Sequence, residues 1–173
     1  MRGRTLRTAL VGLAALLLGT AAAPAWAQTL RIGISEDIDT LDPTQGRTFG
    51  GRQVFAALCD KLFDIDERAN VVGRLVTRHE VSGDGLTVTL HLRDGVTFHD
   101  GTPFDAAAVK FNLERALTIP ESARRGDIRA IRAVEVVDAR TARLSLSEPF
   151  APLFAQLADR AGMMVSPKAA KEA

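Results

Sequence analysis

The side chains that could act as metal ligands or acid–base groups are three histidines and one neighbouring acid. They are His79, His91 and the pair His99-Asp100. Their spacing matches no helical H-x-x-x-H pattern, and no ligand set meets the spacing rules of zinc sites. His91 falls on the polar face of a predicted strand, where solvent or a hydrogen bond explains it. The sequence therefore predicts no metal site and no cofactor, and a metal or hydrolytic centre is kept only as a minor alternative.

The nucleophilic side chains are equally poor candidates for catalysis. Cys59 is the only cysteine of the chain, which excludes a disulfide framework and a multi-cysteine zinc or iron–sulfur site. It falls in a helical pattern and is interpreted as a buried, inert thiol, because a catalytic cysteine needs a basic, partly open setting. Ser82 and Ser166 have neither a nucleophile-elbow sequence nor an evident base. We predict no catalytic residue and do not expect an enzyme.

The composition is ordinary for a soluble globular protein. The 173 residues include 22 basic and 21 acidic side chains, giving a net charge of +1, with 46% hydrophobic and 25% charged residues. The near balance of charge argues against a protein that binds nucleic acid through a strongly basic surface. The hydrophobic content excludes disorder as a class, and the length predicts one domain.

The N-terminal segment has the three parts of a secretory signal peptide. Residues 1–7 contain three arginines, residues 9–18 form a short apolar run, and residues 25–27 read Ala-Trp-Ala. This order is typical of export with cleavage after Ala27. The apolar run is shorter than the ~20 residues that a membrane span needs, and an uncut N-terminal anchor is the alternative. We expect residues 1–27 to be removed from the mature protein.

The elements after this segment are short and of both kinds. Alternation over Leu30–Ile34 predicts a strand, three glycines within residues 44–51 predict a loop, and helical spacing from Arg52 to Phe63 predicts a helix. A purely structural interpretation of the loop glycines is that they supply turns with positive φ angles.

Three later patterns complete the predicted fold. Asp84-Gly85 lies between extended runs and predicts a β-hairpin whose second strand, residues 86–92, buries alternate positions. Asp105 can cap a helix over about residues 106–117, and residues 134–146 predict a second hairpin. The sequence predicts an α+β fold, a mixed sheet with antiparallel hairpins and flanking helices.

One continuous stretch is specific enough to indicate a family. Residues 82–104, SGDGLTVTLHLRDGVTFHDGTPF, resemble the motif S-x-D-G-x-x-x-x-F-x-L-R-x-G-V-x-F-x-D-G-x-P of the family 5 extracellular solute-binding proteins. These are the peptide-, dipeptide- and nickel-type binding proteins of bacterial ABC importers. Further segments resemble the family in the same order: Leu41–Pro43, Leu58–Leu62, Ala106–Arg115, Val134–Asp138 and Glu148–Pro152. Gly73, Val76 and His79 depart from the family pattern.

The resemblance implies part of a type II periplasmic-binding-protein-like fold. Residues 28–43 would form the first strand of lobe I, and residues 44–173 a small α+β domain truncated at the C-terminus. The implied function is a periplasmic component of an ABC importer, a monomer that delivers a peptide-like solute to the permease subunits of an inner-membrane complex and binds no nucleic acid. The alternative is a non-binding remnant or a protein-docking module that lacks the second lobe.

The resemblance also places solute contacts in two loops. In the first loop, Arg47, Thr48 and Phe49 have side chains able to reach a solute. In the second, Arg124 or Arg125 could meet a carboxylate in bidentate fashion. Phe49 could instead fold onto the core, and the two arginines could simply face water. Solute capture would need walls from two lobes and a hinge that closes them.

Overall fold

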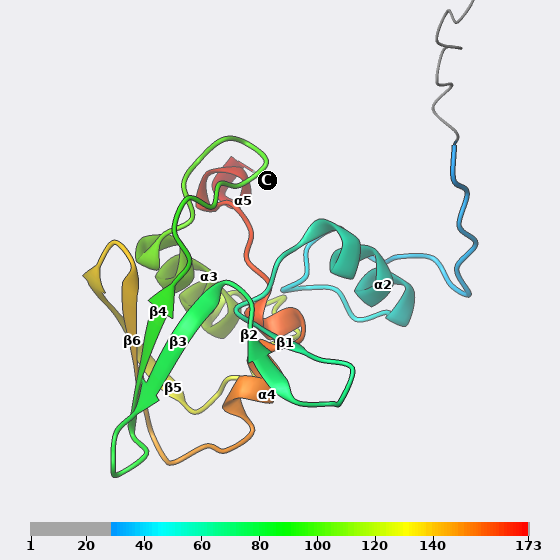
Figure 1. Cartoon of the computed structure of the whole chain (residues 1–173). Helices are drawn as coiled ribbons and strands as arrows, with labels where there is room; N and C mark the ends of the chain where they lie inside the picture. The colour runs from blue at the N-terminus through cyan, green and yellow to red at the C-terminus, as the bar shows by residue number, and fades with distance from the viewer. Residues whose placement is uncertain (1–28, 173) are drawn as a thin grey trace, which may run out of the picture. The chain divides into compact units, whose positions relative to one another are not determined.

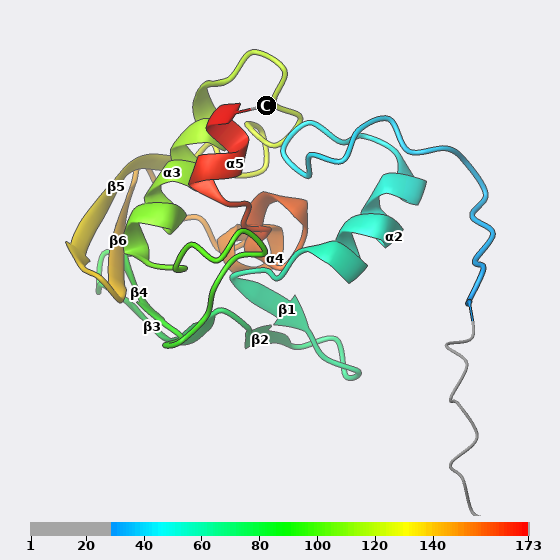
Figure 2. The ribbon, with the colours of Figure 1, turned by 90° about the horizontal axis from the view of Figure 1, so that it is seen from above.

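A four-stranded sheet organises the part of the chain that the computed structural model describes, residues 29–172 (Figure 1). The strand order is β3-β4-β6-β5, and every pairing is antiparallel. The strands are β3 (Val76–Val81), β4 (Thr87–Leu92), β5 (Ile131–Asp138) and β6 (Thr141–Leu146). The helix α3 (Ala106–Thr118) packs on one face of this sheet, against β5 and β6 (Figure 2).

Shorter helices and strands make up the rest of residues 29–172. The strands β1 (Phe63–Ile65) and β2 (Val71–Gly73) form a separate antiparallel hairpin. The remaining helices are α2 (Phe49–Leu58), α4 (Leu153–Leu157), the 3-10 helix η1 (Arg160–Gly162) and α5 (Pro167–Glu172). The α+β class is confirmed, while both sheets of residues 29–172 are antiparallel rather than mixed. No helix within this range is long and apolar enough to cross a membrane.

The core lies between α3 and the sheet because both present an apolar face there. Along β4, Val88, Leu90 and Leu92 are buried and alternate with half-buried polar residues, as the period of two predicts. Val109 and Leu113 of α3 are fully buried on the facing side. Each such Val or Leu side chain contributes about 1.5–3 kcal/mol through its removal from water.

The predicted hairpins and the predicted α3 helix are confirmed. Gly85, at the turn between β3 and β4, has a φ of 71°, which glycine adopts without steric cost. Asp105 accepts a hydrogen bond from the Ala108 N–H at 2.8 Å and so caps α3. The last helical residue is Thr118, and the C-cap Ile119 has extended backbone because proline, here Pro120, disfavours helical backbone in the residue that precedes it.

The helix α2 begins three residues before the predicted start, inside the predicted loop. Thr48 Oγ1 accepts a hydrogen bond from Gly51 N–H at 3.0 Å, and the Glu36 carboxylate accepts one from Gly50 N–H at 2.8 Å. A Cβ at Gly50 would lie 2.6 Å from the Glu36 carbonyl oxygen, so close approach requires the glycine. The interpretation of the three loop glycines as positive-angle turns is wrong, since none of Gly46, Gly50 and Gly51 has a positive φ.

The same helix ends before the predicted position. Cys59 has extended backbone angles, φ −122° and ψ 130°, and comes directly after the last helical residue. Leu62 and Phe63 are buried at the entry to β1 rather than on a helix face. Apolar residues spaced as on a helix thus continue into a strand, and the placement of Cys59 inside the helix is wrong.

Two N-terminal predictions have different outcomes. The signal peptide predicted over residues 1–27 lies outside the described residues. The strand predicted over Leu30–Ile34 does not form, since a strand needs a hydrogen-bonded partner and neither sheet includes these residues. Residues 29–33 belong to a separate unit and contain no helix or strand.

Candidate functional site

The loop at residues 44–48 is held to α3 through Asp42. The Asp42 carbonyl accepts hydrogen bonds from Gln45 and Gly46 N–H at 3.1 and 2.8 Å, which closes a turn. Arg115 of α3 donates to both carboxylate oxygens of Asp42, at 3.2 and 2.5 Å. Burial acts to raise the pKa of Asp42, but the hydrogen bonds and the charge of Arg115 outweigh it and hold the pKa below its usual value. The loop therefore starts from a fixed, charged anchor.

The structure brings the two predicted loops together. Arg124 donates to the Gly46 carbonyl at 3.3 Å and pairs with Asp127 at 3.0 Å, and its side chain is 12% exposed. Ala123 N–H donates to the Thr44 carbonyl at 2.9 Å. Burial lowers the pKa of Arg124, and the neighbouring positive charge of Arg160 lowers it further. Arg124 thus supports the loop through a backbone hydrogen bond. The alternative that its side chain simply faces water is wrong.

Arg160 is the residue of this region that sequence reasoning missed. Its Nη1 atom donates to the carbonyls of Gly46 and Thr48, at 3.1 and 3.3 Å. It belongs to η1, more than a hundred residues later in the chain, so no local motif connects it to the loop. The available signal was a charged pair, Asp159-Arg160, inside an otherwise apolar run.

The first predicted loop presents two side chains outward. Phe49 is 72% exposed, so the alternative that it folds onto the core does not hold. Arg47 is exposed as well, while its N–H donates to the Asp39 carboxylate at 2.8 Å. Thr48 turns inward as the cap of α2, and its hydroxyl donates to Asp39 at 3.3 Å. The guanidinium group of the anchored loop and the aromatic ring at the first residue of α2 therefore lie close together in sequence.

Arg125 has a separate structural contact. Its Nε donates to the Leu117 carbonyl at 2.9 Å, and its Nη2 donates to the Ile119 carbonyl at 2.8 Å. These carbonyls lie at the C-terminal end of α3, where a positive charge is favoured by the helix dipole. The head group of Arg125 is therefore engaged at a helix end.

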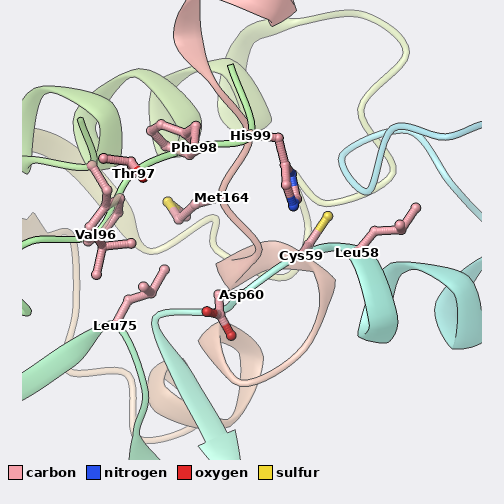
Figure 3. Close-up of a pocket in the computed structure, with 10 residues that line it drawn as sticks. Leu58, Cys59, Asp60, Leu75, Val96, Thr97, Phe98, His99 and Met164 are labelled. Carbon is pink, nitrogen blue, oxygen red and sulfur yellow. The ribbon is translucent and has the colours of Figure 1, made fainter. Parts of the chain in front are cut away.

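The histidines lie in three different environments. The His79 ring packs against Phe154 with 4.5 Å between ring centroids. His91 lies on the sheet, with Nε2 3.5 Å from a Glu80 carboxylate oxygen. His99 lines a pocket with Cys59 (Figure 3). Within residues 29–172, no three His, Cys, Asp or Glu side chains gather as a metal site.

The pocket beside Cys59 is small. Its volume is about 170 Å³, below the ~300–1,000 Å³ typical of sites that enclose small-molecule ligands. Burial raises the pKa of the Cys59 thiol, and the charges of Asp42 and Asp60 raise it further. The thiol is consequently protonated at neutral pH, which agrees with the prediction of an unreactive cysteine, but Cys59 is only partly buried rather than buried as predicted.

The comparison with known proteins places the chain in a family. The model of the bacterial extracellular solute-binding proteins, family 5 (middle), matches residues 70–173. The chain belongs to this family. Family 5 members are solute-binding proteins, a class that performs no bond chemistry. The resemblance inferred from residues 82–104 is confirmed.

The relatives and solved structures that this chain resembles are each much longer than this chain. The glutathione-binding protein GsiB of Pectobacterium atrosepticum is 35% identical over 150 residues, 86% of this chain and 29% of that protein. AgaA of A. tumefaciens R10, a periplasmic binding protein solved with agropinic acid, has a TM-score of 0.73 and 30% identity over 79% of this chain and 28% of its own. An ABC transporter substrate-binding protein of Sinorhizobium meliloti has a TM-score of 0.59 and 32% identity over 65% of this chain and 23% of its own.

These likenesses confirm the predicted fold as part of a type II periplasmic-binding-protein fold. The chain spans less than a third of the length of the curated relatives that it matches. The family 5 assignment therefore covers the α+β unit described above, and the activity of a whole family member is a separate question.

Proposed function

We propose that this chain is part of the solute-binding component of an ABC importer, which takes up a peptide-like solute. The family match over residues 70–173 carries the proposal. Support for the solute class comes from GsiB, which binds glutathione, and from AgaA, which was solved with agropinic acid. The protein acts by binding and delivery and is not an enzyme.

The anchored loop supplies one wall of the solute site. Arg47 and Phe49 contact the solute, since both are exposed, Arg47 on the loop and Phe49 at the start of α2. Arg47 pairs with a carboxylate, and Phe49 covers an apolar part of the solute. Thr48 and Arg124 position the loop from beneath, and Arg125 supports the adjoining loop through the end of α3.

The remaining assignments belong to the same proposal. Residues 28–43 open the first lobe, and residues 44–173 belong to the small α+β domain. Export through the signal peptide at residues 1–27 brings the protein to the periplasm as a monomer. There it meets the permease subunits of the inner-membrane complex.

The test is solute binding by the exported protein as the cells produce it. Calorimetric titration with glutathione and with a panel of dipeptides should identify a solute. Arg47→Ala and Phe49→Ala should then each weaken the Kd by about tenfold, the value of one lost charge-assisted or aromatic contact of roughly 1.4 kcal/mol. Arg68→Ala is the matched control, an exposed arginine at the tip of the β1–β2 hairpin.

Two results would contradict the proposal. Normal folding with no solute-dependent shift in Tm across the panel would favour a remnant or a docking module. Equal losses of affinity in Arg68→Ala and Arg47→Ala would remove the loop from the site.

A further inference from the structure

A polar depression lies where β5 begins and β6 ends. Its volume is about 410 Å³, and it is lined by Arg129, Ile131, Arg132 and Ser147. This volume is within the ~300–1,000 Å³ typical of sites for small molecules. Two guanidinium groups and one hydroxyl line the depression, and no carboxylate is among its lining residues. A space lined in this way favours an anion over a cation or an apolar group.

The backbone under this depression is fixed by burial and by hydrogen bonds. Ile128 and Ile131 are 0% and 3% exposed, and the two arginines that directly follow them are exposed. Ile131 N–H donates to the Ile128 carbonyl at 2.9 Å, and Ser147 N–H donates to the Ala130 carbonyl at 2.8 Å. The two segments that line the depression are therefore tied together before any ligand binds, which lowers the entropy lost on binding.

A β-bulge redirects the side chain of Arg132. The register of β5 against β6 advances by two residues on β5, from Ile131 to Ala133, for one residue on β6. Arg132 is therefore the extra residue of the bulge. Bulges re-aim side chains and often lie next to functional sites, because the extra residue is left out of the regular pairing. The bulge accounts for a second arginine at the depression, only three positions after Arg129.

The charges of the two arginines are available to a ligand. In the part of the chain that the structure describes, neither guanidinium group has a hydrogen bond or an ion pair. The nearest acid before them in the sequence, Asp127, pairs with Arg124 at 3.0 Å. The nearest acid after them, Glu135, pairs with Arg143 at 2.9 Å. Two positive charges beside one depression repel one another, and a bound anion would remove this repulsion.

We propose that Arg129 and Arg132 bind a phosphate group. A guanidinium group presents a planar fork of donors that matches two oxygens of a carboxylate or a phosphate. One arginine is enough for a single carboxylate, whereas two match the higher charge and the additional oxygens of a phosphate. The Ser147 hydroxyl has only a long hydrogen bond, 3.3 Å, to the Ala130 carbonyl, so it can turn and donate to a further phosphate oxygen.

The experiment is an NMR titration of the exported protein with inorganic phosphate at low ionic strength. We expect the amide signals of residues 128–132 and of Ser147 to shift until the site is saturated. Arg129→Gln and Arg132→Gln should each weaken the Kd by about tenfold or more, since each removes a charge-assisted contact. Arg68→Gln is the matched control, because it removes one exposed positive charge at the tip of the β1–β2 hairpin and should leave the Kd unchanged.

A second measurement separates two sources of the phosphate group. Cosedimentation with vesicles of phosphatidylglycerol and phosphatidylcholine in equal parts, compared with phosphatidylcholine alone, tests an anionic lipid headgroup. Binding to the mixed vesicles that both arginine variants lose would identify a membrane surface as the source. Binding of inorganic phosphate without binding to vesicles would identify a soluble phosphate. Either result supports the site.

Three results would overturn the proposal. The first is no saturable shift with phosphate together with no binding to the mixed vesicles. The second is an equal shift of the same signals with acetate, which would make the depression a surface for anions in general. The third is the same loss of affinity in Arg68→Gln as in the two variants, which would trace binding to net charge. Circular dichroism of each variant checks that the fold is retained. None of these results bears on solute binding at the anchored loop.

Discussion

Asn112 joins the C-terminal segment to α3, and its replacement should destabilise the whole unit. The side chain is 5% exposed. Its Nδ2 donates to the carbonyls of Ala108 and Val165, both at 2.9 Å, and its Oδ1 accepts from Val165 N–H at 3.0 Å. One amide thus satisfies both backbone groups of Val165 and one carbonyl of α3. Asn112→Ala would break all three hydrogen bonds at once.

The expected loss is worked from these three bonds. An intramolecular hydrogen bond contributes about 0.5–1.5 kcal/mol net, and a buried group left without a partner costs about 1–3 kcal/mol. Because two groups of Val165 lose their partner together, we expect Asn112→Ala to lower the free energy of unfolding by about 2–4 kcal/mol. For a unit of this size each kcal/mol corresponds to about 2–4 °C, so Tm should fall by roughly 10 °C.

Urea unfolding followed by circular dichroism measures this loss, and Asn112→Asp gives it a pH signature. The introduced carboxyl would face two carbonyl oxygens, so its pKa should be raised in the folded state. The stability of the Asn112→Asp variant, relative to the unchanged protein, should then be highest at low pH. It should fall as the pH rises from the pKa of the unfolded state toward the raised pKa of the folded state. A loss below about 0.5 kcal/mol in Asn112→Ala, or a pH-independent effect of Asn112→Asp, would refute this reasoning.

Three further predictions concern the anchors around the site. Because the pKa of Asp42 is lowered in the folded state, its pairing with Arg115 stabilises the fold above the unfolded pKa of ~3.9. This stabilisation is lost as the pH falls through the folded pKa. Asp42→Asn should therefore flatten the decrease in the free energy of unfolding at acid pH, measured as a stability–pH curve. Ser166→Ala should raise the pKa of Asp100 from about 2 toward its usual value, because the Ser166 hydroxyl is the main cause of the shift, and NMR titration measures it. Gly50→Ala should lower Tm, since its Cβ would meet a backbone oxygen at 2.6 Å; an unchanged Tm would contradict the close approach.

The fold was predictable wherever local rules decide it. The alternation along β4, the Asp84-Gly85 turn and the Asp105 cap each depend on residues within a few positions of one another, and all three are confirmed. The α2 boundaries were not predictable in this way. Glu36, fourteen residues before Gly50, holds the start of the helix, and burial of Phe63 in a hairpin favours a strand beyond its end.

The candidate site shows the same division. The exposed residues Arg47 and Phe49 could be proposed as solute contacts because their segment comes soon after a family segment, and this assignment stays a prediction. The contact between this loop and Arg124 joins residues 78 positions apart, and Arg160 joins the loop from 114 positions away. No periodicity or local propensity carries such information, because these hydrogen bonds exist only once the chain has folded.

The way the loop is held indicates why its geometry matters. Arg124 and Arg160 both donate to the Gly46 carbonyl, and their positive charges repel one another. Burial, and after it the charge of Arg160, lowers the pKa of Arg124. Within residues 29–172 the buried Nε atoms of both have no hydrogen-bond partner. Apolar side chains could fill the same space at lower electrostatic cost, so stability alone does not account for two neighbouring cations. They fix the carbonyls of the loop instead. Under the proposed function, a fixed loop would present Arg47 and Phe49 to a solute without first losing conformational entropy.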